Sequence, residues 1–361
     1  MQRTFVGGAL ITASILAGCV SPDSASVCDA RLNHLQMIGS HNSYKLSLPP
    51  EELALIEAQS PDWAVALDYG HVSLSEQLDL GMRQLELDVF YDPDGGRFAD
   101  PLGPKLSGVA YDRTGLEEQG FKAIHVQDVD ARSSCLLFTD CLAEIATWSR
   151  ANPAHEPLLI LVNAKQASLG VPGTVEPLPF DAEAFNALDA EIRASLEIDQ
   201  LLSPDDVRGD AATLREAILS GGWPSLEESR GQIFFALDES EAVIDVYRRG
   251  ELSLDGHAMF VNSSDPTASD AAYFTINDPI AAADEIAARV ADGFVVRTRA
   301  DADTLEARAG DRRRLDAALA SGAQYISTDY YQPRTEWSDY SAALPSGAVS
   351  RSNPVVACGS S

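Results

Sequence analysis

The sequence predicts a single α/β domain in which eight parallel strands form a barrel. Short runs of apolar and β-branched residues recur eight times along the 361-residue chain. Segments with apolar residues at helical spacing alternate with many of these runs, and such alternation favours a parallel sheet. Polar side chains able to do chemistry stand at or near the ends of several runs. A (β/α)8 barrel gathers its catalytic groups at that end of its strands.

The strands and helices are expected in a regular order. The strands are expected at 35–40, 84–89, 122–127, 158–163, 232–237, 258–262, 293–298 and 323–328. Helices with apolar spacing and starting caps are expected at 73–82, 139–151, 181–196, 279–291 and 303–320. Long insertions at 92–120 and 167–231 follow the second and fourth strands, and they would either shape a substrate pocket or pack over the barrel wall. The barrel domain is expected to span 31–340, followed by a tail at 341–361.

The composition is that of a globular protein, with 45% hydrophobic and 22% charged residues. The length alone permits two ordinary domains or one large barrel. The net charge is −29, and lysine occurs only at positions 45, 105, 122 and 165. Nucleic acid is therefore not expected as a partner, because binding to its backbone requires clustered Lys and Arg. We interpret the acidic excess as a solvated surface and expect a monomer.

The N-terminus has the form of an export signal. Arg3 precedes an apolar run from Phe5 to Ala17, which is too short to span a membrane. The run ends in Leu-Ala-Gly-Cys, which resembles a bacterial lipobox, so we expect a signal peptide at 1–18 and a lipid on Cys19. Residues 19–30 would then be a lipidated tether. An ordinary export signal is the alternative, and both place the mature chain outside the cytoplasm, as a membrane-anchored lipoprotein or a secreted protein.

Export favours disulfides among the other four cysteines. Cys135 and Cys141 are separated by only five residues and are expected to close a local loop. Cys28 and Cys358 flank the folded region, and a barrel places its last strand beside its first, so these two ends can meet. Three pairings are possible in principle, and we favour 135–141 with 28–358, which would fix the tail to the domain. Metal binding by these cysteines is not expected, since no CxxC pair occurs.

Glu86 and Asp88 are the core of an expected metal site. They lie two residues apart on one expected strand, so their side chains point to the same face. A bare pair of carboxylates among apolar neighbours would be costly, and a hard divalent cation with oxygen ligands would relieve the repulsion. Asn42 and Asn163, near the ends of two other strands, offer amide oxygens. The alternative for an isolated Glu-x-Asp is a solvated strand edge.

His41 and His125 fall at the ends of the first and third expected strands. A single histidine in a strand is more often structural, but two histidines flanking a pair of carboxylates indicate acid–base chemistry. Lys165, Arg297 and Arg299 are candidates for binding a phosphate or a sugar ring. Salt bridges within the barrel rim are the alternative for the two arginines.

Several motifs together resemble one family. They are GSHNSY at 39–44, LSEQLDLGMRQLELDV at 74–89, IHVQD at 124–128, VVRTRADADTLEAR at 295–308 and GAQYISTDYY at 322–331. This succession resembles the bacterial calcium-dependent phosphatidylinositol-specific phospholipase C family over nearly the whole domain. The resemblance implies a distorted α/β barrel of the phosphodiesterase type. It also implies that His41 and His125 are catalytic, and that Asn42, Glu86 and Asp88 bind one Ca²⁺ ion.

The chain departs from the family pattern in its fourth expected strand. Relatives commonly place a carboxylate two residues before a lysine, whereas this chain has Asn163-Ala164-Lys165. An amide oxygen still coordinates calcium but adds no charge. We therefore expect Asn163 to be a weaker fourth ligand.

The reaction that the resemblance implies is cleavage of phosphatidylinositol, or a related inositol phosphodiester, to diacylglycerol and inositol phosphate through a cyclic phosphate. The inositol 2-hydroxyl would attack phosphorus with His41 or Glu86 as base, while His125 protonates the leaving oxygen. A glycerophosphodiester phosphodiesterase is the main alternative, although such enzymes usually begin with a His-Arg-Gly motif. A non-catalytic, ligand-binding surface lipoprotein is the other, and the presence of both histidines and both carboxylates argues against it.

Overall fold

The computed structural model of the chain describes residues 30–345 and 347–356. The expected signal peptide, the expected lipid on Cys19 and the expected Cys28–Cys358 bridge lie outside the described residues. In the described part, every helix is too short or too polar to cross a membrane.

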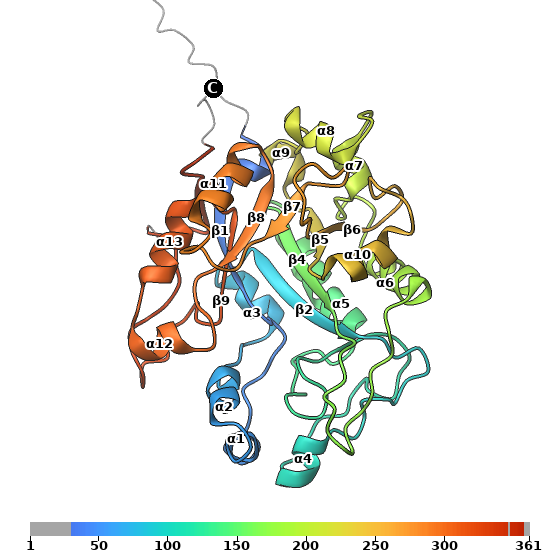
Figure 1. The fold of residues 1–361 in the computed structure, drawn as a ribbon, viewed down its shortest axis with the longest axis vertical. Helices are drawn as coiled ribbons and strands as arrows, with labels where there is room; N and C mark the ends of the chain where they lie inside the picture. The colour runs from blue at the N-terminus through green and yellow to red at the C-terminus, as the bar shows by residue number, and fades with distance from the viewer. Residues whose placement is uncertain (1–29, 346, 357–361) are drawn as a thin grey trace, which may run out of the picture.

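Two five-stranded sheets lie at the centre of the molecule (Figure 1). The strands are β1 Leu35–Ser40, β2 Gln84–Phe90, β3 Lys122–Ala123, β4 Leu158–Ala164, β5 Ile233–Leu237, β6 Met259–Val261, β7 Tyr273–Thr275, β8 Val295–Arg299, β9 Tyr325–Thr328 and β10 Ser350–Ser352. One sheet has the order β10-β1-β9-β8-β7 and the other β3-β2-β4-β5-β6. Neighbouring strands pair in parallel, except β3 and β10, which pair antiparallel at the sheet edges. The structure therefore confirms an α/β fold built on parallel sheets.

Helices surround the sheets and follow the strands. They are α1 Pro50–Glu57, α2 Pro61–Leu67, α3 Leu74–Asp79, α4 Leu102–Ser107, α5 Phe138–Ala151, α6 Ala182–Ser195, α7 Pro204–Arg208, α8 Leu214–Leu219, α9 Leu226–Ser229, α10 Glu241–Arg248, α11 Ala283–Ala291, α12 Leu305–Ala309 and α13 Arg313–Ser321, with a 3₁₀ turn at Leu32–His34. Helix α3 begins where expected, because Ser73 and Glu76 form a capping box. The helix expected at 303–320 is instead two helices, separated at Gly310, whose φ of 64° ends the first.

The two sheets adjoin at both of their seams. Asn262, just after β6, forms a single parallel bridge with Tyr273 of β7. At the other seam, the Arg83 amide donates to the Ile38 carbonyl (2.9 Å) and the Ser43 amide to the Glu86 carbonyl (2.9 Å). The seam between β1 and β2 therefore brings residues 41–43 beside Glu86, and it positions the site described below.

One expected parallel strand runs antiparallel, and two strands of the structure, β7 and β10, were not expected. Of the expected strand 122–127, only β3 is a strand, and it runs antiparallel to β2. The connection before it holds only the short α4, beyond the end of β2 (Figure 1), so no helix crosses the sheet as a parallel return requires. The eighth parallel strand is β7, which has three residues, as β6 does.

The long insertion after β4 divides between the two ends of the sheets. Its first part lies at the end where strands such as β2 finish, since the Gln127 side chain donates to the Ala167 carbonyl (2.8 Å). Its last part lies at the opposite end, because the Leu32 amide, just before β1, donates to the Pro224 carbonyl (3.2 Å). Only the first part therefore stands near the expected catalytic groups.

The described part of the C-terminal tail is joined to the fold by a strand. β10 pairs with the start of β1, and the guanidinium of Arg351 donates to the side-chain oxygen of Gln36.

The expected local disulfide is confirmed between Cys135 and Cys141, whose Cα atoms lie 5.2 Å apart.

Candidate active site

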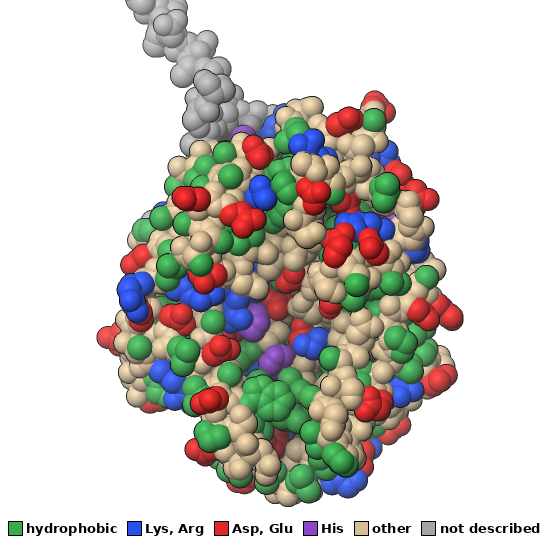
Figure 2. All heavy atoms as spheres, in the orientation of Figure 1, with side chains coloured by type: hydrophobic (Ala, Val, Ile, Leu, Met, Phe, Trp, Pro, Cys, Tyr) green, Lys and Arg blue, Asp and Glu red, His purple; other side chains and the backbone are tan. Residues whose placement is uncertain are grey.

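The chemistry-bearing side chains gather where the parallel strands end. His41 follows β1, Glu86 and Asp88 lie on β2, Asn163 on β4, and Arg297 and Arg299 on β8. Figure 2 shows two histidines in a hollow at the centre of one face, with acidic and basic side chains around them. Hydrophobic side chains lie directly below the histidines in that view, where Figure 1 places α1 and α2.

His41 is oriented by a buried carboxylate. Its Nδ1 lies 2.8 Å from Oδ1 of Asp329, while Nη1 of Arg299 lies 3.4 Å from its Nε2. This arrangement suits a neutral imidazole that donates from Nδ1 and presents the Nε2 lone pair. Burial, together with Arg299, holds the pKa of His41 well below its usual range. His41 is therefore placed to accept a proton.

His125 is held in the same way by a different aspartate. Its Nδ1 lies 2.8 Å from Oδ2 of Asp130, which leaves Nε2 for a substrate. Nζ of Lys45 lies 3.3 Å from the same Asp130 oxygen, and both Lys45 and Asp130 are fully buried. Burial alone would raise the pKa of Asp130, but Lys45 and His125 bring it below its usual value.

Tyr69 lies between the two histidines. Its ring centroid is 6.1 Å from that of His41 and 6.4 Å from that of His125. Its hydroxyl accepts a hydrogen bond from the Asn42 side chain (2.7 Å), and its carbonyl accepts one from Lys45 (2.6 Å). The Tyr69 ring therefore packs between the two imidazoles.

Glu86 and Asp88 each have a cationic partner. Oε2 of Glu86 lies 2.6 Å from Nη2 of Arg297, and Oε1 accepts from the Asn163 side chain at 3.2 Å. Oδ2 of Asp88 lies 3.0 Å from Nζ of Lys165. Arg297 therefore forms a salt bridge within the fold, which is the alternative to phosphate binding given above.

The donor atoms of the expected metal site fit calcium in kind. Asn42, Glu86, Asp88 and Asn163 offer two carboxylates and two amide oxygens, and the β2–β4 register places Asp88 opposite Asn163. Calcium prefers such oxygen ligands. Among the described residues, no three His, Cys, Asp or Glu side chains converge to hold a metal by themselves. The amides would therefore have to complete the shell, and its charge would be low.

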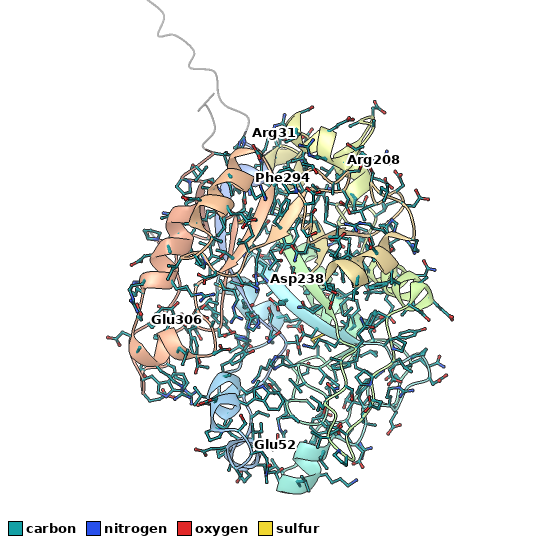
Figure 3. All side chains as sticks on the ribbon, in the orientation of Figure 1. Arg31, Glu52, Arg208, Asp238, Phe294 and Glu306 are labelled. Carbon is teal, nitrogen blue, oxygen red and sulfur yellow. A yellow bond between two sulfur atoms is a disulfide. The ribbon has the colours of Figure 1, made fainter. Side chains whose placement is uncertain are left out.

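Two further carboxylates lie at the end of β5. Asp238, near the centre of the molecule (Figure 3), accepts a hydrogen bond from the Asn262 side chain at 2.8 Å. Glu239 accepts one from the Ala164 amide (2.8 Å), and burial raises its pKa to about 7. Glu239 adds acidic character beside Lys165, and Asp238 does so near Arg297.

A pocket opens beside His125. It has a volume of about 370 Å³, and its wall includes Trp63, His125, Lys165 and Glu239. A second hollow of about 420 Å³ lies beyond Asp329 and is bordered by His71 and Tyr331. Nε2 of His71 donates to the His41 carbonyl (2.8 Å), and burial lowers the pKa of His71 to about 4, so this histidine is a neutral packing residue.

Sequence reasoning missed the residues that orient the histidines. Asp329 lies in the motif GAQYISTDYY, and Asp130 lies just past IHVQD, so a polar residue close to each strand end was the available signal. Asp301 was also missed. It accepts hydrogen bonds from the Asp329 amide (2.8 Å), the Tyr340 hydroxyl (3.0 Å) and the Thr328 hydroxyl, and so fixes the turn that carries Asp329.

Comparisons with known proteins agree with this geometry. The sequence profile of the family "Phosphoinositide phospholipase C, Ca2+-dependent" matches residues 30–354. No curated protein sequence is significantly similar to the chain.

Two solved bacterial enzymes have a similar fold. A Ca²⁺-dependent phosphatidylinositol-specific phospholipase C from Streptomyces antibioticus is 18% identical, with a TM-score of 0.52 over 84% of this chain and 95% of that one. A calcium-dependent phosphoinositol-specific phospholipase C from Pseudomonas sp. is 14% identical, with a TM-score of 0.55 over 90% of this chain and 96% of that one. Because the profile covers nearly all described residues, the chain belongs to the Ca²⁺-dependent phosphoinositide phospholipase C family, as its motifs predict.

Proposed function

We propose that this phosphodiesterase cleaves phosphatidylinositol to diacylglycerol and an inositol phosphate by two-histidine acid–base catalysis. The observation that carries the proposal is the matched pair of imidazoles. Each is bound at Nδ1 by a buried aspartate, at 2.8 Å in both cases. Nε2 is then the nitrogen that would meet the substrate, and in His41 it lies 3.4 Å from Nη1 of Arg299 and 3.6 Å from Oε1 of Glu86.

In the first step, Nε2 of His41 removes the proton from the inositol 2-hydroxyl, whose oxygen attacks phosphorus. Nε2 of His125 gives a proton to the departing diacylglycerol oxygen as its bond to phosphorus breaks. We assign the base to His41 rather than Glu86, since both Glu86 oxygens already accept hydrogen bonds from Arg297 and Asn163. The product is a cyclic inositol phosphate.

In the second step, the two histidines exchange roles. His125, now neutral, removes a proton from water, whose oxygen attacks phosphorus. The bond between phosphorus and the inositol 2-oxygen breaks, and His41 protonates that oxygen as the ring opens. Arg299 and Lys165 bind the phosphate oxygens, because their side chains are 15% and 33% exposed and a substrate can therefore reach them. Asn42, Glu86, Asp88 and Asn163 would hold one calcium ion, which supplies a Lewis acid that lowers the pKa of the hydroxyl and screens charge on phosphorus.

The remaining features of the protein are part of the same proposal. The eight parallel strands would form an incomplete (β/α)8 barrel, with its interruptions at the β1–β2 and β6–β7 seams. The catalytic domain would span 31–340. Lipid on Cys19 and the tether at 19–30 would keep a monomeric enzyme at an extracytoplasmic membrane surface, where its substrate lies, and Cys28–Cys358 would fix the tail.

The test is hydrolysis of phosphatidylinositol vesicles by the purified protein, with calcium and with excess chelator. Phosphorus NMR should detect a cyclic inositol phosphate that forms before the open monophosphate. Turnover without any cyclic product would contradict attack by the 2-hydroxyl. Full activity in chelator would contradict the calcium requirement.

A further inference from the structure

The two carboxylates of the metal site are already neutralised by cations of this chain. Arg297 lies 2.6 Å from Glu86, and Lys165 lies 3.0 Å from Asp88. The two pairs together carry no net charge, and Asn163 adds none. The four ligands with their two cationic partners would thus offer calcium no net negative charge, on which tight calcium binding depends.

The two cations differ in their freedom to move. The Lys165 side chain is 33% exposed and can turn outward into water. The Arg297 side chain is only 2% exposed, and its Nη1 donates to Oδ1 of Asn277. Arg297 is therefore held between Glu86 and Asn277, and its charge cannot leave the neighbourhood of Glu86.

We propose that Arg297 competes with calcium for Glu86 and thereby sets the calcium affinity of this chain. When calcium binds, Oε2 of Glu86 must give up its contact with Arg297, and the fixed guanidinium charge repels the ion. Between calcium-binding events, the same ion pair holds Glu86 in place. The inference rests on the proposed function only in taking Glu86 and Asp88 as calcium ligands.

The geometry also indicates how the competition can be altered from outside the site. Asn277 lies after β7, its residue is exposed, and it touches Arg297 on the side away from Glu86. A carboxylate at this position would attract the guanidinium and loosen its hold on Glu86. Asn277→Asp therefore tests the idea without changing a ligand or a buried residue.

The experiment is titration calorimetry of the purified full-length protein with calcium chloride, which does not depend on turnover. Arg297→Gln should bind calcium about tenfold more tightly or better, since ligand charge tunes such sites over several decades. Asn277→Asp should shift the affinity in the same direction by a smaller factor. Arg297→Lys, which keeps the charge, should stay near the wild-type value.

Arg299→Gln is the matched control. Arg299 lies on the same strand and is also partly buried, but its carboxylate partner is Asp329, which is not a ligand. Its loss should leave calcium affinity within about twofold of wild type. Circular dichroism and melting temperature establish that each variant is folded.

Unchanged or weaker calcium binding by folded Arg297→Gln would overturn the inference. If Arg297→Gln does not fold, unchanged or weaker binding by Asn277→Asp overturns it instead. A lack of calcium binding by wild type and both variants would also overturn it. Tighter binding in the variants with no cleavage of phosphatidylinositol by wild type would support the competition and reject the proposed function separately.

Discussion

Replacing Asp130 by asparagine separates the catalytic role of His125 from the stability of the fold. Asp130 and Lys45 are both fully buried. Oδ2 of Asp130 lies 2.8 Å from Nδ1 of His125 and 3.3 Å from Nζ of Lys45. The substitution keeps the size of the side chain but removes its charge. It therefore leaves the Lys45 ammonium without a counter-ion and the His125 imidazolium without its acceptor.

The magnitude of the stability effect follows from the partners that Lys45 keeps. Breaking a buried ion pair costs about 3–5 kcal/mol. Lys45 still donates to the carbonyls of Leu67 (3.1 Å) and Tyr69 (2.6 Å), and it lies 4.4 Å from the Tyr69 ring centroid. We therefore expect a loss near the lower end, about 3 kcal/mol, in urea unfolding at pH 7.

The catalytic effect should depend on the leaving group. Turnover of phosphatidylinositol should fall by about two to four orders of magnitude, as for loss of a positioned acid. An inositol phosphodiester with a nitrophenol leaving group needs little protonation, so its turnover should fall far less. Asp329→Asn is the matched control, because Asp329 serves His41 (2.8 Å), and its loss should slow both substrates alike.

The double variant Lys45→Met, Asp130→Asn distinguishes orientation of His125 from general destabilisation. Removing both charges takes away the uncompensated ammonium, so most of the lost stability should return. Turnover of phosphatidylinositol should stay low, because His125 still lacks its carboxylate. Recovery of activity together with stability, or equal losses on both leaving groups, would refute the assignment of His125 as a general acid oriented by Asp130.

Three other predictions follow from the structure. Trp63 is 42% exposed beside the His125 pocket, so Trp63→Ala should weaken binding to phosphatidylinositol vesicles and raise KM for them, but leave turnover of soluble glycerophosphoinositol unchanged. Ile198→Ala, at a 97% exposed position away from the mouth, is the control. Burial raises the pKa of Glu191 to about 7, so the folded state binds the proton more tightly and stability falls as pH rises from about 4.5 to 7. After a discount for partial exposure, Glu191→Gln should be about 1–2 kcal/mol more stable than wild type at pH 8, with little difference at pH 4, in urea unfolding; equal stability at pH 8 would contradict it. The double substitution Cys135→Ser, Cys141→Ser should lower the free energy of unfolding by about 2 kcal/mol, the entropy of so short a loop, and an unchanged melting temperature would contradict this.

The sequence predicted the parts of the site that depend on local pattern. His41 and Asn163 stand at or near strand ends because apolar runs define those strands, and the two-residue period of a strand places Asp88 on the same face as Glu86. The helix at 73–82 was predictable from its cap for the same reason. Such features depend on neighbours in the chain, which a single sequence displays directly.

The partners of these residues depend on contacts between distant segments. Asp329 is 288 residues from His41, and Arg297 is 211 residues from Glu86. No periodicity shows that a side chain of β8 meets one of β2, which belongs to the other sheet, so Arg297 remained open between a ligand for phosphate and a salt bridge. The prediction of a parallel strand at 122–127 was wrong for a similar reason, because the direction of the strand depends on where the preceding connection runs.

The four cations of the candidate active site differ in burial and therefore in role. Lys45 and Arg297 are enclosed, at 0% and 2% side-chain exposure, and each is used to hold a carboxylate in place. Arg299 and Lys165 are exposed enough to meet a substrate, and each already has an acidic partner, Asp329 and Asp88. The mouth therefore offers a phosphodiester two cations whose charge is largely balanced, which suits a substrate with a single negative charge at the scissile bond. Binding energy would then come mainly from hydrogen bonds and from apolar contact beside Trp63.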